Sequence, residues 1–277
     1  MRLLLYAAAR YIYSNSIWYN SVMFDALILG IVQGLTEFLP VSSTAHLILF
    51  PWLFHWGGVL DSLTFDLALH AGTLCALLLC FWRDWLDILM KKQKLLLLII
   101  LASVPAGVAG ILLEHMVESK LRSPLIIAAS LVAVGVLLLA SERAFKHRRV
   151  DDLGYADAVV IGLSQAVALI PGVSRSGITI SSGLFRGLER ESAARFSFLL
   201  STPVIGGAVL LHLRKMLAGG AGHDTSLFAA GFIASALTGL VAIKFLMNFL
   251  KKHPVNVFAY YRFGLAAVIM IGIWLKG

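Results

Sequence analysis

Charged residues are scarce in this chain of 277 residues: 14% are Asp, Glu, Lys or Arg, whereas 59% are hydrophobic. Soluble domains carry roughly 25% charged residues, so the composition excludes an ordinary soluble domain and indicates an integral membrane protein. The net charge of +8 is typical of a membrane protein whose cytoplasmic loops are rich in Lys and Arg. Because there is no long basic tail, we expect a lipid bilayer and no nucleic acid as partner.

Cysteine is nearly absent as well. The two cysteines, Cys75 and Cys80, lie in one apolar run. Five residues apart on a helix, they point to different faces. Neither a disulfide nor a shared metal site fits this spacing, so we interpret both as small apolar packing residues.

Two apolar regions, 25–55 and 156–186, lack an unbroken apolar run of about 20 residues. A run of that length is needed to span a bilayer. Pro, Gly and Ser interrupt both near the middle, and halves of roughly 12–16 residues are too short to span. Irregular backbone at membrane depth is tolerated only where it lines a protein cavity. We therefore predict two re-entrant helix–loop–helix hairpins.

Six other segments are long and apolar enough to cross the membrane. They lie near 63–82, 95–114, 123–141, 193–213, 227–249 and 257–275. The predicted fold is thus an all-α integral membrane protein with about six transmembrane helices, two re-entrant hairpins and an inverted repeat.

Basic residues orient the predicted spans. The side that holds the loop after the span 63–82 carries fourteen Lys and Arg, counting Arg262, and the other side carries five. The positive-inside rule places the richer side in the cytoplasm. The first hairpin then enters from outside and the second from the cytoplasm.

The two broken regions resemble each other at an offset of 132 residues. DALILGIVQGLTEFLPVSSTAH (25–46) aligns with DAVVIGLSQAVALIPGVSRSGI (157–178), with identical Asp, Gly, Gln and Val-Ser positions. Three predicted crossings separate the copies, so they have opposite orientations, as in transporter-like inverted repeats whose sites lie near the midplane.

We expect residues 1–22 to form an N-terminal extension, with Met23 as an alternative start. Residues 23–277 then form one membrane domain of two repeats, about 25–141 and 157–277.

The second hairpin carries PGVSRSGIT, Pro171 to Thr179. A helix that opens after Pro171 and Gly172 presents free N–H groups, and the guanidinium of Arg175 matches a phosphate bidentately. We predict a phosphate cradle here, with Arg175 at its centre. A structural alternative is that Arg175 only pairs with Glu37.

The first hairpin carries QGLTEFLPVSSTAH, Gln33 to His46. Gln33 and Glu37 share one helix face and offer oxygens suited to a hard divalent cation, although an intramembrane Glu could instead carry protons in a transporter. Ser43 and His46 lie one helical turn apart, which permits a nucleophile–base pair. The neighbouring hydroxyls of Ser42 and Thr44 are ordinary helix caps or substrate ligands.

Four further polar residues are weaker candidates. His70 and Asp66 share a helical face and could support the site, whereas Tyr261 and Arg262, at the start of the last span, are typical interfacial anchors.

The two motifs, in this order and with FWRDW after the span 63–82, resemble the signatures of the bacterial undecaprenyl-diphosphate phosphatase family, also called bacitracin-resistance proteins. The resemblance covers residues 24–277. Gln33 stands where many members have glutamate, which puts the metal role of this position in doubt, and Ala45 stands where glycine is frequent.

The resemblance implies a membrane hydrolase that converts undecaprenyl diphosphate to undecaprenyl phosphate and inorganic phosphate. This activity recycles the lipid carrier for peptidoglycan synthesis and confers bacitracin resistance. It further implies a divalent cation, Mg²⁺ or Ca²⁺, and a site that opens to the periplasmic side of the bacterial inner membrane. The implied central residues are Glu37, Ser43, His46 and Arg175, and Ser174, Ser176 and Thr179 belong to the second signature. From the residues themselves we expect Ser42, Thr44, Ser174, Ser176 and Thr179 as substrate ligands, with Gln165 of the second hairpin as a weaker candidate. We expect Glu37 and Gln33 as the metal ligands.

Several alternatives stay open at this point. The nucleophile is Ser43 with His46 as base, His46 itself, or a metal-bound water, and we favour the first. A transporter or lipid flippase also suits an inverted repeat. The other membrane phosphatase class needs a histidine soon after Ser174-Arg175, whereas none occurs before His212. The sequence is compatible with a homodimer but does not determine the oligomeric state.

Overall fold

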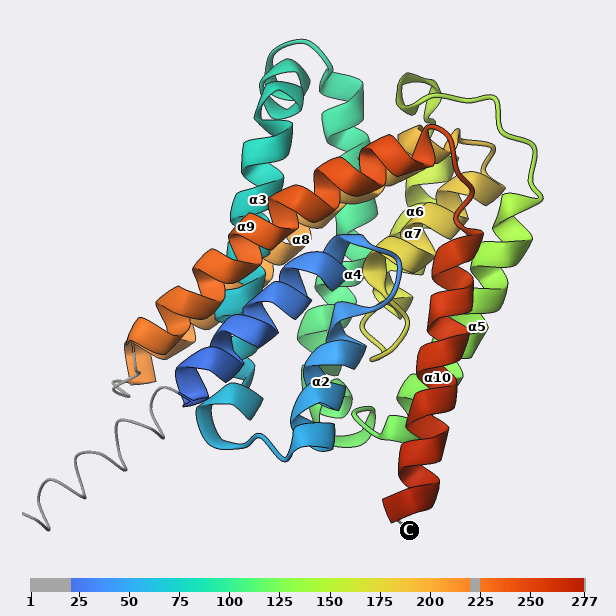
Figure 1. Cartoon of the computed structure of the whole chain (residues 1–277). Helices are drawn as coiled ribbons and strands as arrows, with labels where there is room; N and C mark the ends of the chain where they lie inside the picture. The colour runs from blue at the N-terminus through green and yellow to red at the C-terminus, as the bar shows by residue number, and fades with distance from the viewer. Residues whose placement is uncertain (1–20, 220–224, 277) are drawn as a thin grey trace, which may run out of the picture.

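The computed structural model describes residues 21–219 and 225–276, and its regular structure over these ranges is helical (Figure 1). Residues 1–20 of the predicted N-terminal extension lie outside the described residues. In chain order the helices are Ser21–Phe38, α2 (Ser43–Phe54), η1 (Gly58–Asp61), α3 (Leu63–Met90), α4 (Gln93–Lys120), α5 (Pro124–Glu142), η2 (Val150–Asp152), α6 (Tyr155–Val167), α7 (Arg175–Phe185), α8 (Arg190–Gly219), α9 (Thr225–Leu250) and α10 (Asn256–Lys276).

The six predicted spans are confirmed as the helices α3, α4, α5, α8, α9 and α10, each of them long and apolar enough to cross a membrane. The chain is a multi-pass membrane protein. Capping residues and proline mark the first turns of two of these helices. Ser62 caps α3 by accepting a hydrogen bond from the Phe65 N–H at 3.1 Å, and Pro124 occupies the first turn of α5, where its missing N–H costs nothing.

The first half of the first hairpin is longer than we predicted. Ser21–Phe38 has 18 residues and passes the same length and composition test as the six spans, so the prediction that it is too short to span is wrong. The chain nevertheless reverses after it. Figure 1 shows this helix, in dark blue, rising to the middle of the molecule and α2 descending from there.

The two hairpins have matching turns. Ser42 and Ser174, equivalent at the offset of 132, are the residues before α2 and α7 and have positive φ angles of 77° and 73°. Each hydroxyl caps its own helix, accepting from the N–H of Ala45 at 3.4 Å or of Gly177 at 3.1 Å. A hydrogen bond of 3.1 Å from Ser176 Oγ to the Leu39 carbonyl joins the two turns.

Helix packing follows the same offset. A Cβ on Gly30 would lie 2.8 Å from the Cβ of Ala234 in α9, and one on Gly162 would lie 2.7 Å from the Cα of Ala102 in α4. Ala102 and Ala234 are themselves 132 residues apart. Each hairpin therefore lies close against a helix of the other proposed repeat, and this crossed packing supports the inverted-repeat interpretation.

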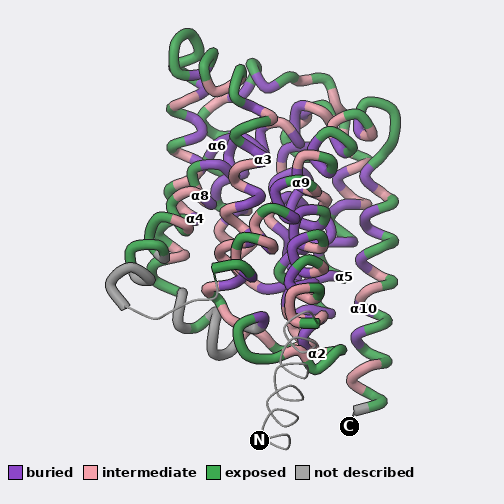
Figure 2. Tube along the Cα trace, turned by 60° about the vertical axis from the view of Figure 1, so that its left-hand side comes forward, coloured by how far each residue is buried: buried purple, intermediate pink, exposed green. Residues whose placement is uncertain are grey.

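Burial separates an interior from an apolar outer surface (Figure 2). The largest buried cluster draws on most of the helices and includes Phe38, Phe81 and Phe198. Large apolar side chains remain exposed on the outside, among them Ile111, Leu112 and Leu210. Such a surface would be a liability in water, whereas it suits contact with lipid tails.

Candidate active site

The carboxylate of Glu37 is the centre of a buried polar cluster. Glu37 lies in the last turn of the helix Ser21–Phe38, and its side chain is 6% exposed. The hydroxyl of Ser43 donates a hydrogen bond to Glu37 Oε2 at 2.5 Å, and Gln33 Nε2 donates to the same oxygen at 3.1 Å. The helix geometry puts Gln33 and Glu37 on one face, and the turn at Pro40 folds Ser43 back onto them.

The second hairpin contributes Arg175, the first residue of α7. Its Nη1 atom lies 3.6 Å from Glu37 Oε1, so the ion pair foreseen as a structural alternative is present. Nη1 is nevertheless buried without a hydrogen-bond partner among the described residues. A buried guanidinium nitrogen without a hydrogen-bond partner among the described residues, at a helix N-terminus, is suited to binding an anion.

Helix α3 adds His70 to the same cluster. His70 Nδ1 lies 2.7 Å from the Asp66 carbonyl; since a carbonyl only accepts, this nitrogen carries the proton. Nε2 lies 3.6 Å from Glu37 Oε2. The sequence placed His70 among the weaker candidates, because nothing in the local pattern shows that α3 faces the first hairpin.

His46 is buried and lies three residues after Ser43, but the two side chains have different hydrogen-bond partners. Its Nδ1 donates to the Ser42 carbonyl at 2.7 Å, which leaves Nε2 of the neutral ring to accept from the Tyr261 hydroxyl at 2.8 Å. The hypothesis of a Ser43–His46 pair therefore does not fit the geometry: Ser43 donates to Glu37 and His46 bridges the turn to α10. Tyr261, which is 49% exposed, thus has a hydrogen-bond partner in the first hairpin that its interpretation as an interfacial anchor does not include.

Arg262 was also expected at the membrane surface and is instead fully buried, with 0% exposure. Its guanidinium donates to backbone carbonyls in both hairpin turns, those of Pro40, Gly172 and Val173. Arg262 therefore does not belong in the count of loop charges, although the excess on that side does not depend on it. A usable signal was present: an arginine several residues inside an apolar span is costly unless it has partners.

The other predicted substrate ligands have mixed positions. Ser42 and Ser174 are caps of α2 and α7, and Ser176 bonds the opposite turn. Thr179 bonds the Arg175 carbonyl and Ser197 Oγ, both at 2.7 Å, and so packs α7 on α8. Gln165 faces the Ala102 carbonyl of α4 at 3.4 Å. Thr44 is exposed. The structure thus brings Gln33, Glu37, Ser43 and Arg175 together, but not Gln165 or Thr179.

A divalent cation can be tested against the oxygens of this cluster. Among the described residues, no group of three or more His, Cys, Asp and Glu could hold a metal ion. The buried Gln33 Oε1 has no hydrogen-bond partner there and lies on the residue beside the Glu37 carboxylate. Mg²⁺ is usually bound by one or two carboxylates together with substrate phosphates, so Gln33 and Glu37 fit a cation that binds with a phosphorylated substrate.

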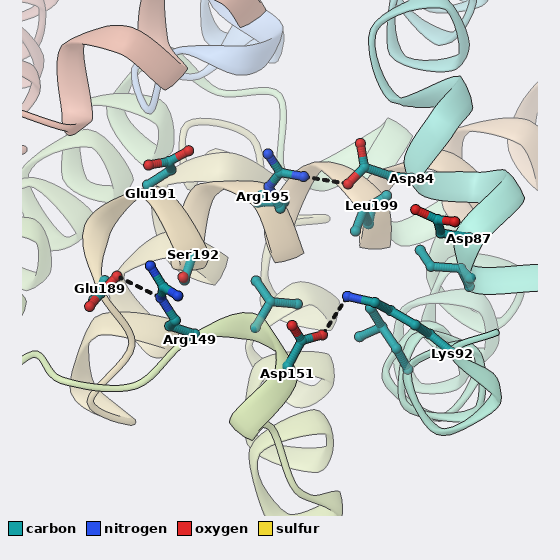
Figure 3. A pocket seen from close by; sticks show the side chains of 13 residues that line it. Asp84, Asp87, Lys92, Arg149, Asp151, Glu189, Glu191, Ser192, Arg195 and Leu199 are labelled. Atoms are coloured by element: carbon teal, nitrogen blue, oxygen red, sulfur yellow. Dashed lines mark hydrogen bonds and ion pairs between the residues drawn. The ribbon is translucent and has the colours of Figure 1, made fainter.

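A charged cavity of about 300 Å³ lies elsewhere, between the end of α3, the start of α4, η2 and the start of α8 (Figure 3). Ion pairs cross it: Lys92 with Asp151 at 2.7 Å, Arg149 with Glu189 at 3.9 Å, and Arg195 with Asp84. None of the residues in the Glu37 cluster lines it. We interpret these pairs as ties between helix ends, at the end of the molecule where the basic loops lie.

Comparison with known proteins gives one family. Residues 26–268 match the family model described as bacitracin resistance protein BacA. The chain is 55% identical over 249 residues to the undecaprenyl-diphosphatase of Thermodesulfovibrio yellowstonii, covering 90% of this chain and 96% of that protein. It is 45% identical to the undecaprenyl-diphosphatase of Moorella thermoacetica over 262 residues, covering 91% and 98%. The corresponding protein of Desulforudis audaxviator is 46% identical over 263 residues, covering 92% and 99%.

Proposed function

The chain belongs to the BacA family of bacitracin resistance proteins, and from this premise we propose that it is a membrane phosphatase that hydrolyses undecaprenyl diphosphate. The products are undecaprenyl phosphate and inorganic phosphate. One observation carries the proposal: Glu37 and Ser43 of one hairpin meet Arg175 of the other, and Arg175 Nη1 is buried without a hydrogen-bond partner among the described residues.

The geometry supports Ser43 as nucleophile and Glu37 as its base. The hydroxyl already donates to Glu37 Oε2, so the proton has an acceptor when Ser43 Oγ attacks the terminal phosphorus. The new Ser–O–P bond forms as the bond from that phosphorus to the bridging oxygen breaks, and undecaprenyl phosphate leaves with the electron pair. Water then attacks the phosphoserine, giving inorganic phosphate and restoring the serine. A positioned base contributes typically 10²–10⁴-fold to such a step.

Arg175 binds the phosphoryl group in this proposal. Its guanidinium and the free N–H groups at the start of α7 would stabilise the charge that spreads over the equatorial oxygens in the transition state. His46, bonded to the Ser42 carbonyl, holds the residue just before Ser43 in place. Gln33 and Glu37 would hold a divalent cation, Mg²⁺ or Ca²⁺, which when bound neutralises the charge of the diphosphate.

Phosphate release by the purified protein tests the proposal. With undecaprenyl diphosphate in detergent, we expect metal-dependent release that a chelator abolishes and that falls at least about 10²-fold in Arg175→Ala. Arg149→Ala, an exposed arginine at the basic end, is the matched control and should keep the wild-type rate. A wild-type protein that releases no phosphate from any polyprenyl diphosphate would overturn the phosphatase assignment in favour of a transporter.

We further propose that the protein recycles the lipid carrier for peptidoglycan synthesis from the bacterial inner membrane, with the site open to the outer face. The excess of Lys and Arg in the loops at one end supports this orientation. A thiol reagent that does not cross membranes should label Gly57→Cys in intact cells but not Lys91→Cys. The reverse labelling pattern would contradict the orientation.

A further inference from the structure

Arg262 joins the two halves of the site without touching the Glu37 cluster. Its Nη1 donates to the Pro40 carbonyl at 3.3 Å in the first turn. Its Nη2 donates to the carbonyls of Gly172 at 2.7 Å and Val173 at 3.1 Å in the second turn. Among the described residues, no other side chain donates hydrogen bonds to turn carbonyls of both hairpins.

The same guanidinium is anchored to a spanning helix. Arg262 Nε donates to the Leu131 carbonyl at 3.0 Å and Nη2 to the Ser130 carbonyl at 3.2 Å, both in α5. Every recorded partner is thus a backbone carbonyl, and the residue is fully buried. A buried charge without a carboxylate partner is expensive, so its presence in a membrane helix indicates a use.

The bonded carbonyls lie two or three residues before the residues that act in the proposed reaction. Pro40 lies three residues before Ser43, and Val173 lies two residues before Arg175. Because peptide groups are planar and trans, a Val173 carbonyl turned toward Arg262 directs the Ser174 N–H away from it. Arg262 therefore fixes the peptide orientation at the start of α7 as well as the separation of the two turns.

We propose that Arg262 is a positioning residue for the hydrolysis: from α10 it holds both hairpin turns so that Ser43 and Glu37 stay in register with Arg175. The inference rests on the proposed function. Arginine suits this role because its planar fork presents five donors in fixed directions, whereas a lysine ammonium keeps the charge without that geometry. Small misplacements of reacting groups can cost about 10²-fold in rate.

The test compares Arg262→Lys and Arg262→Ala with wild type for kcat, KM and the midpoint of thermal unfolding, Tm. We expect kcat to fall about 10²-fold in both variants, with KM changed less than about threefold because Arg175 and the metal ligands remain. Guanidinium ion should restore part of the kcat of Arg262→Ala, and ammonium ion should not. A purely structural role would not produce this selective rescue.

Arg148→Lys is the matched control. Arg148 also donates to backbone carbonyls, those of Arg186 and Asp152, but at the basic end. Its replacement should lower Tm while kcat per folded molecule stays at the wild-type value.

Two outcomes would overturn the inference: wild-type kcat per folded molecule in Arg262→Lys, or an Arg262→Lys protein that does not fold, which would make Arg262 a stability residue. If Arg262→Ala does not fold, Arg262→Lys decides. A wild-type protein without phosphatase activity would instead refute the proposed function itself.

Discussion

At the scale of single residues, the proposed chemistry rests on the hydrogen bond from Ser43 to Glu37. The spacing of one helical turn predicts a Ser43–His46 pair, but His46 Nδ1 donates to the Ser42 carbonyl and His46 Nε2 accepts from the Tyr261 hydroxyl. The spacing along one helix therefore does not determine which hydrogen-bond partner a side chain has. The carboxylate six residues before Ser43 is brought to it by the turn at Pro40.

Replacing Glu37 by glutamine tests its role as base. The amide has nearly the same shape but cannot accept the serine proton as a carboxylate does, so we expect kcat/KM to fall by about 10²–10⁴-fold. Glu189→Gln, at the exposed end of the molecule, should keep the wild-type value. Steady-state phosphate release measures both, and an unchanged kcat/KM in Glu37→Gln would exclude Glu37 as base.

The hydroxyl of Tyr261 should matter through His46. In Tyr261→Phe the buried His46 Nε2 loses its recorded partner, and an unmet buried hydrogen bond costs about 1–3 kcal/mol. We expect kcat to fall roughly 10-fold if that cost is felt in the transition state. The neighbouring and more exposed Tyr260 provides the control, since Tyr260→Phe should leave kcat unchanged. Equal kcat values in Tyr261→Phe and Tyr260→Phe would show that the hydrogen bond from Tyr261 to His46 does not contribute to the rate.

At the scale of elements, close approach of helices sets the hairpins in place. The backbone of Ala102 in α4 fills the space where Gly162 would carry a side chain, with its carbonyl oxygen 2.6 Å from the position that a Cβ would take. By contrast, apart from the backbone of its own helix, no atom of the described residues lies within 4 Å of the corresponding position on Gly107, also in α4.

Alanine at these two glycines should therefore have opposite effects. Gly162→Ala overpacks against backbone, which costs about 1–3 kcal/mol, and Tm should fall by several degrees. Gly107→Ala should leave Tm unchanged or raise it slightly, because alanine favours helix by up to about 1 kcal/mol over glycine. Thermal unfolding in a nonionic detergent measures both. A Tm of Gly162→Ala at or above the wild-type value would show that the hairpin can shift away from α4.

The helices and turns could be predicted where the sequence pattern that specifies them is local. Apolar runs of spanning length gave the six spans, and Pro, Gly and Ser gave the two turns. The length of Ser21–Phe38 was underestimated because the helix begins at Ser21, four residues before Asp25, where the predicted broken region begins. The roles of His70, Tyr261 and Arg262 depend on contacts between helices distant in sequence, which no local pattern contains.

At the scale of the whole molecule, the basic end is tied together by ion pairs. The side chain of Asp157, at the start of α6 and outside the spanning helices, is 3% exposed. It accepts hydrogen bonds from Arg148 Nη2 at 2.7 Å and Arg186 Nε at 2.6 Å. Although burial opposes the charged form, these hydrogen bonds and that of the Gly154 N–H lower the pKa of Asp157 from 3.8 to about 2.

This lowered pKa predicts how stability depends on pH. A carboxyl with a lower pKa in the folded state stabilises the fold fully above its unfolded pKa, near 3.8, and loses that contribution as the pH falls through about 2. In Asp157→Asn we expect a lower Tm at pH 7 and a smaller further loss between pH 4 and 2. Asp151→Asn, in an exposed pair with Lys92, should resemble wild type. Parallel Tm profiles for wild type and Asp157→Asn would contradict this reasoning.

The central claim is that Ser43 of the first hairpin takes the phosphoryl group that Arg175 of the second hairpin holds. A single turnover with undecaprenyl diphosphate labelled in the terminal phosphate, quenched on the millisecond scale and followed by peptide mapping, tests it most directly. We predict transient label on the peptide that contains Ser43, and neither label nor turnover in Ser43→Ala. Full turnover in Ser43→Ala, or label on His46 instead, would contradict the claim.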